Sequence, residues 1–342
     1  KMIPPLFLSK SVRHVVFAYL EPSTGRRPIV PTKKSKVLVI GSLNVDLVVR
    51  ADIIPQAGET LKGNSFSRYS GGKGANQAVA AAQLGAQVSM IGRVGTDLFG
   101  DEQLRSLTQS GVDVRAVVRD GDSPTGVAVI AVEEQSGQNR IIVIPGANAT
   151  CSPRDVDEHR ALIGAVDVVL AQLEIPMTTV EAAADVALEN GVLFILNPAP
   201  AHQLPLSLLA KVGVLTPNEH EAESICGISV NDLEGARQAA AFLRDQGVGK
   251  VIITLGDRGV YGIDAEGEFH IPAHDVQVVD TVAAGDAFSG ALAVALAEGR
   301  SLREAAEFAN ATAAISVTRH GAQASMPDRR EVDAFLTQVK RC

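Results

Sequence analysis

Short apolar runs alternate with alanine-rich helical runs along most of this 342-residue chain, and this alternation limits the folds it can adopt. Strand patterns at 37–40 and 88–94 accompany helix patterns at 75–84 and 99–110, and the same alternation continues from 166 to 255. Repeated βαβ units build a mostly parallel sheet with helices on both of its faces. The sequence therefore predicts an α/β fold of three layers, a helix–sheet–helix sandwich.

Two stretches that contain only strand patterns, about 44–70 and 125–146, lie outside this alternation. The first predicts short strands at 47–50 and 60–66. The second predicts a hairpin, because residues 126–133 and 140–144 alternate around the turn signature 135–138. We expect the two stretches to form a small β-sheet lid over one edge of the domain. In the last third of the chain, the patterns predict a strand at 274–279. Helices are predicted at 286–297, 302–316 and 329–339.

Composition and charge exclude several classes of function. The formal charge of −8 argues against general binding to nucleic acids or anionic membranes, and no apolar run approaches the ~20 residues that span a bilayer. Cys151, Cys226 and Cys342 are widely separated and fit no metal-binding spacing. They are interpreted as reduced thiols, so we expect a cytoplasmic protein.

Residues 1–36 differ from the rest of the chain. They contain eight Lys or Arg residues and a single acid, Glu21. A basic, acid-poor leader is typical of an organelle transit peptide, and a cloning or start-site artefact is the alternative. We expect the folded domain to comprise residues 37–342.

The segment Asp280–Gly290 joins the predicted strand 274–279 to a helix. Ala283, Ala284 and Gly285 precede the acid Asp286, and small residues at a helix start let the backbone N–H groups approach an anion closely. A carboxylate beside such an anion site could take the proton from an attacking hydroxyl, as phosphoryl transfer to an alcohol requires. The alternative is an ordinary loop with an Asp at the helix start. Ser289 lacks the G-x-S-x-G context of a nucleophile elbow.

Gly71–Gln77 (GGKGANQ) is glycine-rich but is not a Walker A motif, because Gly74 stands where Ser or Thr is needed. Lys73 and Asn76 near a helix start could hydrogen-bond sugar hydroxyls. A glycine-rich helix start with a solvated lysine is the alternative.

Polar residues recur where the predicted strands end. In an open α/β sheet the ligand lies beyond these carboxyl ends, and several polar groups there suit a polyhydroxylated small molecule. His270 and His274 are interpreted as ordinary residues rather than metal ligands, since Pro272 lies between them. The polar strand ends are 41–46, 172–174, 197–200, 216–219 and 254–259.

Taken together, these segments resemble the PfkB carbohydrate kinase family, and within it the branch that phosphorylates D-ribose. The resemblance runs from about Val37 to the C-terminus. It rests on GSLNVD (41–46), GGKGANQAVAAA (71–82), PGAN (145–148), QLEIP (172–176), NPAPA (197–201), 216–221, 280–288 and VTRHGAQAS (317–325).

The resemblance implies a role for each matching residue. Asp286 would be the general base, and the backbone N–H groups of Ala283, Ala284 and Gly285 would stabilise the transferred phosphoryl group. Sugar hydroxyls would be held by Asn44, Asp46, Gly72, Lys73, Asn76 and Glu174. The ATP site would comprise Asn218, Glu221, Thr254, Leu255, Gly256, Asp257, Arg258, Gly259 and Asn310. A monovalent cation would be bound, mostly through backbone groups, by Asp280, Val282, Ser316, Arg319, Gly321 and Ser325.

The expected activity is therefore ATP-dependent phosphorylation of D-ribose at O5, with Mg²⁺ bound to ATP and K⁺ as activator. Asn218 and Glu221 match the family's N-x-x-E pattern, which is associated with Mg²⁺. The resemblance also implies a homodimer formed through the lids. Two alternatives remain open: a sibling kinase for deoxyribose, another sugar or a nucleoside, and a non-catalytic sugar-binding regulator.

Overall fold

The computed structural model describes residues 34–136 and 138–339. The chain divides into two units, 1–33 and 34–342, and only the second is described here. Most of the basic leader therefore lies outside the described residues, and its last residue, Lys36, begins the first strand.

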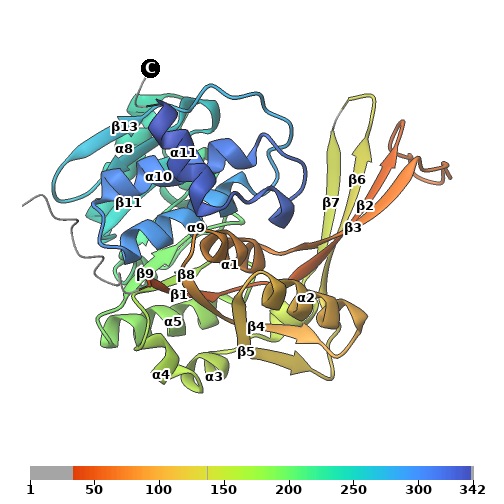
Figure 1. Cartoon of the computed structure of the whole chain (residues 1–342), viewed down its shortest axis with the longest axis horizontal. Helices are drawn as coiled ribbons and strands as arrows, with labels where there is room; N and C mark the ends of the chain where they lie inside the picture. The colour runs from red at the N-terminus through yellow and green to blue at the C-terminus, as the bar shows by residue number, and fades with distance from the viewer. Residues whose placement is uncertain (1–33, 137, 340–342) are drawn as a thin grey trace, which may run out of the picture. The chain divides into compact units, whose positions relative to one another are not determined.

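A nine-stranded sheet forms the centre of the domain (Figure 1), in the order β13-β12-β11-β10-β9-β8-β1-β4-β5. All neighbours from β11 to β5 are parallel, and β12 and β13 are antiparallel. β1 lies between β4 and β8, so the order of connection reverses there, and such a switch point is where ligands bind in open α/β sheets. The strands are β1 (Lys36–Ile40), β4 (Gln87–Gly95), β5 (Val112–Asp120), β8 (Val168–Ala171), β9 (Leu193–Leu196), β10 (Val214–Leu215), β11 (Lys250–Thr254), β12 (Val260–Ile263) and β13 (Glu268–Ile271).

Helices cover both faces of this sheet. Successive side chains of a strand point to opposite faces. Accordingly, Val37 and Val39 of β1 pack with α1, α9 and α10, whereas Leu38 and Ile40 pack with α5 and α8. The predicted three-layer α/β fold is thus confirmed. No helix of the described ranges is long and apolar enough to cross a membrane. The helices are α1 (Lys73–Gln83), α2 (Leu98–Gln109), α3 (Pro153–Asp157), α4 (Arg160–Ile163), α5 (Met177–Glu189), α6 (Leu206–Leu209), α7 (Glu219–Cys226), α8 (Leu233–Asp245), α9 (Ala284–Ala297), α10 (Leu302–Ser316) and α11 (Arg329–Val339).

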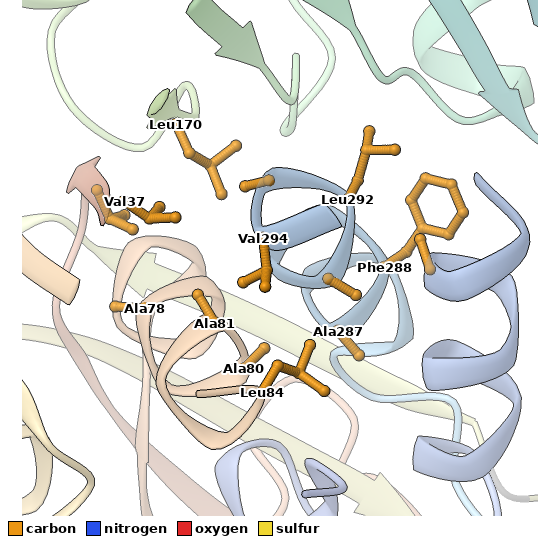
Figure 2. Packing of buried hydrophobic residues seen from close by; sticks show 14 of the residues in the cluster. Val37, Ala78, Ala80, Ala81, Leu84, Leu170, Ala287, Phe288, Leu292 and Val294 are labelled. Carbon is orange, nitrogen blue, oxygen red and sulfur yellow. The ribbon is translucent and has the colours of Figure 1, made fainter. Parts of the chain in front are cut away.

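The alanine-rich helices α1 and α9 pack closely against each other, largely through small side chains. Figure 2 shows Ala80 and Ala81 of α1, and Leu84 directly after it, facing Ala287 and Val294 of α9. A Cβ atom on Gly290 of α9 would lie 2.7 Å from both the Ala80 Cβ and the Gln77 carbonyl oxygen. This close approach brings the first turns of the two helices within hydrogen-bonding distance.

A separate four-stranded sheet, β3-β2-β6-β7, forms the lid (Figure 1). β2 (Asn44–Ala51) runs antiparallel to β3 (Ser65–Gly71) and parallel to β6 (Gly126–Glu133), and β6 runs antiparallel to β7 (Asn139–Ile144). The predicted hairpin 126–144 is confirmed, except that Gly137 in its turn lies outside the described residues. β2 continues directly from the loop after β1, so the lid is joined to the switch point of the main sheet.

Two predicted elements differ from the structure, and one observed strand was not predicted. The run 274–279 is not a strand: it alternates, but no strand in residues 34–136 or 138–339 pairs with it, and Val278 and Val279 are exposed. A strand predicted to start at Thr60 begins only at Ser65. β5 was not predicted, although its charged, alternating sequence is typical of a sheet edge.

Candidate active site

Asp286 lies in the first turn of α9, and its residue surface is only 6% exposed. The helix begins after Ala283, whose φ of 60° is uncommon for a residue with a side chain. Within the described part of the chain, the N–H groups of Ala283 and Gly285 have no hydrogen-bond acceptor, while that of Ala284 donates to the Thr281 carbonyl at 3.3 Å. The helix start therefore offers free N–H groups beside a carboxylate, a setting that attracts anions.

Two amide side chains of α1 hold the Asp286 carboxylate. Asn76 Nδ2 donates to Oδ2 and Gln77 Nε2 donates to Oδ1, each at 3.0 Å. Burial raises the pKa of Asp286, and the Lys73 ammonium and the two amide donors offset only part of this rise. A carboxylate with a raised pKa is a stronger base than an exposed one, so Asp286 is suited to accept a proton.

Lys73 begins α1 and is the cation of this site. Burial alone would lower its pKa, but the carboxylates of Asp286, Glu174 and Glu221 outweigh that effect and raise the pKa above its ordinary value. The ammonium therefore stays charged among three carboxylates. It can attract a further anion, such as a phosphate group, into the same space.

Residues that follow β1 and β8 are hydrogen-bonded to each other and to the start of α1. Glu174 Oε2 accepts hydrogen bonds from Ser42 Oγ at 2.5 Å and from the Lys73 backbone N–H at 3.1 Å. Asn44 is buried, and its Oδ1 accepts from Asn148 Nδ2 at 2.8 Å. This bond directs the Nδ2 donor end of Asn44 away from Asn148, where it can meet an acceptor.

Asp46 lies near the start of strand β2 of the lid, where the charges of Glu174 and Asp286 act on it. Burial, and then the charges of those two carboxylates, raise its pKa to about 7. Gly71 packs directly on the Asp46 carboxyl group, and any Cβ at position 71 would collide with it. Gly72, with a φ of 89°, precedes α1 and turns the chain from the lid into the helix.

Beside Asp286 opens a cavity of about 390 Å³. It extends from the start of α9 across the ends of β9, β10 and β11, and this volume is in the range of small-molecule sites. Thr254 and Asn310 line it from opposite sides, and Asn310 Nδ2 donates to the Pro272 carbonyl at 2.9 Å. The residues of the sequence prediction that line this cavity are Lys73, Asn218, Glu221, Thr254, Gly256, Gly259, Ala283, Ala284, Gly285, Asp286 and Asn310.

Asn218 and Glu221 form a capping box at the start of α7. The Glu221 N–H donates to Asn218 Oδ1 at 2.8 Å, and the Asn218 N–H donates to Glu221 Oε2 at 2.9 Å. Burial raises the pKa of Glu221. Its second oxygen, Oε1, has no hydrogen-bond donor among the described residues, so a hard cation or a water could be bound there.

The residues predicted to bind a monovalent cation lie on two loops that Asp280 connects. Its Oδ1 accepts from the Val282 N–H and its Oδ2 from the Gly321 N–H, both at 3.0 Å. Ser316, the last residue of α10, instead donates its hydroxyl to the Ala313 carbonyl of the same helix, and Ser325 donates to the Ala322 carbonyl. Arg319 pairs with Glu331. No group of three or more His, Cys, Asp or Glu side chains with metal-binding geometry occurs in residues 34–136 and 138–339.

Three residues predicted for the ATP site do not line the cavity. Leu255 is fully buried in the core under the sheet, so only its backbone could face a ligand. Arg258 pairs with Glu219 at 3.2 Å, and Asp257 lies beside it in the same short turn.

Gln77 and Asn148 were not among the predicted site residues. Gln77 contacts Asp286 directly, and Asn148 fixes the backbone at Leu43 by donating to its carbonyl and accepting from its N–H. Both lie in quoted motifs, GGKGANQ and PGAN. The motifs predicted which segments belong to the site. Only the folded structure shows that these two amides contact Asp286 and the Leu43 backbone.

Comparisons with known proteins agree with this geometry. The family model described as "pfkB family carbohydrate kinase" matches residues 34–329. The ribokinase of Haemophilus influenzae is 42% identical over 304 residues, which cover 89% of this chain and 99% of that protein. A deoxyribokinase of Salmonella typhi is 37% identical over 302 residues, 88% of this chain and 98% of that one. The structure of Arabidopsis thaliana ribokinase complexed with ribose and ATP superposes with a TM-score of 0.84 at 34% identity, covering 89% of this chain and 99% of that one.

Proposed function

This chain belongs to the pfkB family of carbohydrate kinases, and we propose that it transfers the γ-phosphoryl group of ATP to O5 of D-ribose. The observation that carries the proposal is the buried carboxylate of Asp286, which lies beside the free N–H groups of a helix start and opens onto a cavity. The similarity to named ribokinases over nearly their whole length supports ribose as the substrate.

The reaction needs one proton transfer and one exchange of bonds at phosphorus. Asp286 accepts the proton of the O5 hydroxyl as that oxygen forms its bond to the γ-phosphorus. The bond from the γ-phosphorus to the bridging oxygen breaks, and ADP leaves with that electron pair. The N–H groups of Ala283 and Gly285 are placed to stabilise the charge on the transferred group, and Lys73 adds a positive charge on the facing side.

The sugar is assigned to the space between the lid and the start of α1. Asn44 presents an amide donor there, while Asp46 and Glu174 present acceptors. Asn76 Oδ1 is buried and has no hydrogen-bond partner among the described residues. A buried acceptor without a donor is costly, and a sugar hydroxyl would satisfy it.

Mg²⁺ and K⁺ belong to this proposal. Glu221 fits Mg²⁺, a hard cation that prefers oxygen ligands, because Oε1 is the free oxygen of a carboxylate that lines the cavity. Bound with ATP, Mg²⁺ would neutralise phosphate charge. K⁺ fits the two loops that Asp280 joins, because carboxylate and backbone oxygens there could be its ligands. A cation at this place would stabilise the loop that leads into Ala283.

A sibling activity on 2-deoxyribose is the second candidate, since a deoxyribokinase is also similar over nearly its whole length. The two substrates differ only in the 2-hydroxyl. Discrimination by one hydroxyl is large where the site hydrogen-bonds it and small elsewhere.

The lid supports a homodimer. Its register places Val129 beside Ile142 and Val49 beside Phe66 on one face, opposite the face that carries Asp46. Ile142 and Phe66 are about two-thirds exposed, at 66% and 65%. A second copy of the lid would cover this apolar face. The reduced thiols Cys151 and Cys226 support a cytoplasmic location.

Coupled ADP release tests this function, with D-ribose, 2-deoxyribose, fructose and inosine each assayed in KCl and in NaCl. We expect ribose-dependent ADP formation that is faster in KCl. Faster ADP formation with another substrate would show that the chain is a kinase with a different sugar or nucleoside specificity, and the proposed mechanism would still hold. Folded protein that binds ribose but forms no ADP with any substrate would be a sugar-binding regulator, and the proposal would be wrong.

A further inference from the structure

Gln77 is completely buried, yet every hydrogen-bonding atom of its side chain has a partner. Its Nε2 donates to Asp286 Oδ1 and to Asn197 Oδ1, both at 3.0 Å. Its Oε1 accepts from Gln172 Nε2 at 2.6 Å. An amide has two donor hydrogens and one acceptor oxygen, so this side chain is fully engaged and has one allowed orientation.

The orientation is set from the backbone. Asn197 Nδ2 donates to the Thr216 carbonyl at 3.0 Å, and a backbone carbonyl can only accept. Asn197 must therefore turn its Oδ1 toward Gln77, and Gln77 must turn its Nε2 toward both Asn197 and Asp286. The donor Gln172 Nε2 at the other end of the amide is consistent with this orientation, because it meets Gln77 Oε1.

We propose that Gln77 is a positioning residue for catalysis, which fixes the carboxylate of Asp286 in one rotamer and presents a permanent donor to it. This inference rests on the proposed function, in which Asp286 is the base. Gln77 does not line the cavity, so it acts through Asp286 and not on the substrate. Ordinary core packing would not require three converging amides, because an apolar side chain of the same length would fill the space without needing partners.

The donor also affects the charge state of Asp286. The negative charge on Asp286 is disfavoured by burial and by the nearby carboxylates of Glu174, Asp46 and Glu221. It is favoured by the Lys73 ammonium and by the amide donors of Asn76 and Gln77. Removing the Gln77 donor therefore shifts the balance toward the protonated, inactive acid.

Two variants of Gln77 separate this role from simple packing. Gln77→Met keeps length and burial without donors, and Gln77→Glu keeps the shape but places a second acceptor against Asp286 and Asn197. If only shape mattered, the isosteric Gln77→Glu would be the milder change. The proposed role predicts the reverse order at pH 8: kcat should be higher for Gln77→Met than for Gln77→Glu.

The measurement is kcat and KM for ribose from pH 5 to 9. For Gln77→Met we expect kcat to fall about 10²-fold, the scale of a misplaced catalytic group, with KM changed less than about 3-fold. The acidic limb of the kcat profile should move to higher pH. Thr179→Val is the matched control, because it removes a buried hydrogen bond to the Cys151 carbonyl on the far layer. It should lower the melting temperature and leave that limb in place.

A Gln77→Met variant with wild-type kcat and an unmoved acidic limb would overturn the inference. If Gln77→Met does not fold, Gln77→Glu decides alone: lost kcat at an unchanged melting temperature supports the role, and wild-type kcat overturns it. A wild-type chain with no ribose-dependent ADP formation would instead overturn the proposed function, and the inference with it.

Discussion

Asp286 is surrounded mainly by neutral donors, and its nearest formal positive charge is the Lys73 ammonium. This setting suits a base that must be ionised before the reaction and protonated after it. A tight ion pair would hold the carboxylate in its charged form and weaken it as a base. Amide donors fix its position with a smaller effect on its pKa.

Replacing Asp286 by Ala should lower kcat by roughly 10²- to 10⁴-fold, the usual contribution of a positioned general base. ATP affinity, measured by equilibrium dialysis, should change little, because the cavity walls remain. Thr179→Val, a buried position on α5 that does not line the cavity, is the control and should keep kcat within a few-fold. An Asp286→Ala variant with near-normal turnover would exclude this residue as the base.

The pKa of Asp46, raised to about 7, makes a second prediction, on stability. The folded chain binds this proton more tightly than the unfolded chain, whose Asp has an ordinary pKa near 4. The resulting stabilisation is complete below about pH 4 and is lost as the pH rises through 7. Asp46→Asn removes the buried charge, so it should melt at a higher temperature than wild type at pH 8.

The melting temperatures of the two proteins should converge as the pH falls toward 4. The difference in unfolding free energy at pH 8 should be a few kcal/mol at most, since one unit of pKa shift corresponds to about 1.4 kcal/mol. The same variant should weaken ribose binding about 10- to 100-fold through a lost hydrogen bond to a charged acceptor. A gap in melting temperature that stays constant from pH 4 to 9 would contradict this assignment.

Single residues could be predicted from the sequence where a motif carries them, as with Asp286 and Lys73. The contacts between them could not. Gln77 and Asn197 are 120 positions apart, and Asn76 and Asp286 are 210 apart. Their pairing depends on how α1 packs against α9 and against the end of β9, which no local pattern contains.

The packing of α1 on α9 leads to a prediction at the level of elements. Gly290→Ala would place a Cβ atom 2.7 Å from the Ala80 Cβ and the Gln77 carbonyl, so the helices must separate. We expect a loss of about 1–3 kcal/mol in unfolding free energy, typical of overpacking, together with a fall in kcat as the contact of Gln77 with Asp286 loosens.

Gly121→Ala is the matched control for Gly290→Ala, because nothing lies within 4 Å of a Cβ atom at Gly121. Chemical denaturation and steady-state kinetics measure the two effects. If Gly290→Ala retained both wild-type stability and wild-type kcat, the close approach of the helices would not be required.

The predictability of the elements follows from their surroundings. β1 and α9 were predicted well because buried strands and alanine-rich helices have strong patterns. The run 274–279 has the alternation of a strand, but a strand also needs a neighbour. Among the described residues its end is hydrogen-bonded to the Val317 carbonyl, through the N–H groups of Val279 and Asp280, and to no strand. β5 carries charges at a sheet edge, where solvent permits them and the apolar signal is weak.

At the level of the whole molecule, the apolar outer face of the lid predicts self-association. Every residue of β7 is exposed, and β3 and β7 are the edge strands of the lid. Ile142→Glu places a charge in the centre of the proposed contact, so sedimentation at micromolar concentration should show a monomer in place of a dimer. Leu188→Glu, an equally apolar and 59% exposed position on α5, should remain dimeric. A wild-type monomer would contradict the dimer.

The central claim is that Asp286 directs ATP-dependent phosphorylation to O5 of ribose. The most direct test is to incubate the chain with ATP, Mg²⁺ and D-ribose and to identify the product by ³¹P and ¹³C nuclear magnetic resonance, with Asp286→Ala in parallel. We predict ribose 5-phosphate in equal amount to ADP from the wild type, and product formed roughly 10²- to 10⁴-fold more slowly by the variant. A phosphate on another hydroxyl, or equal product from both proteins, would contradict the account.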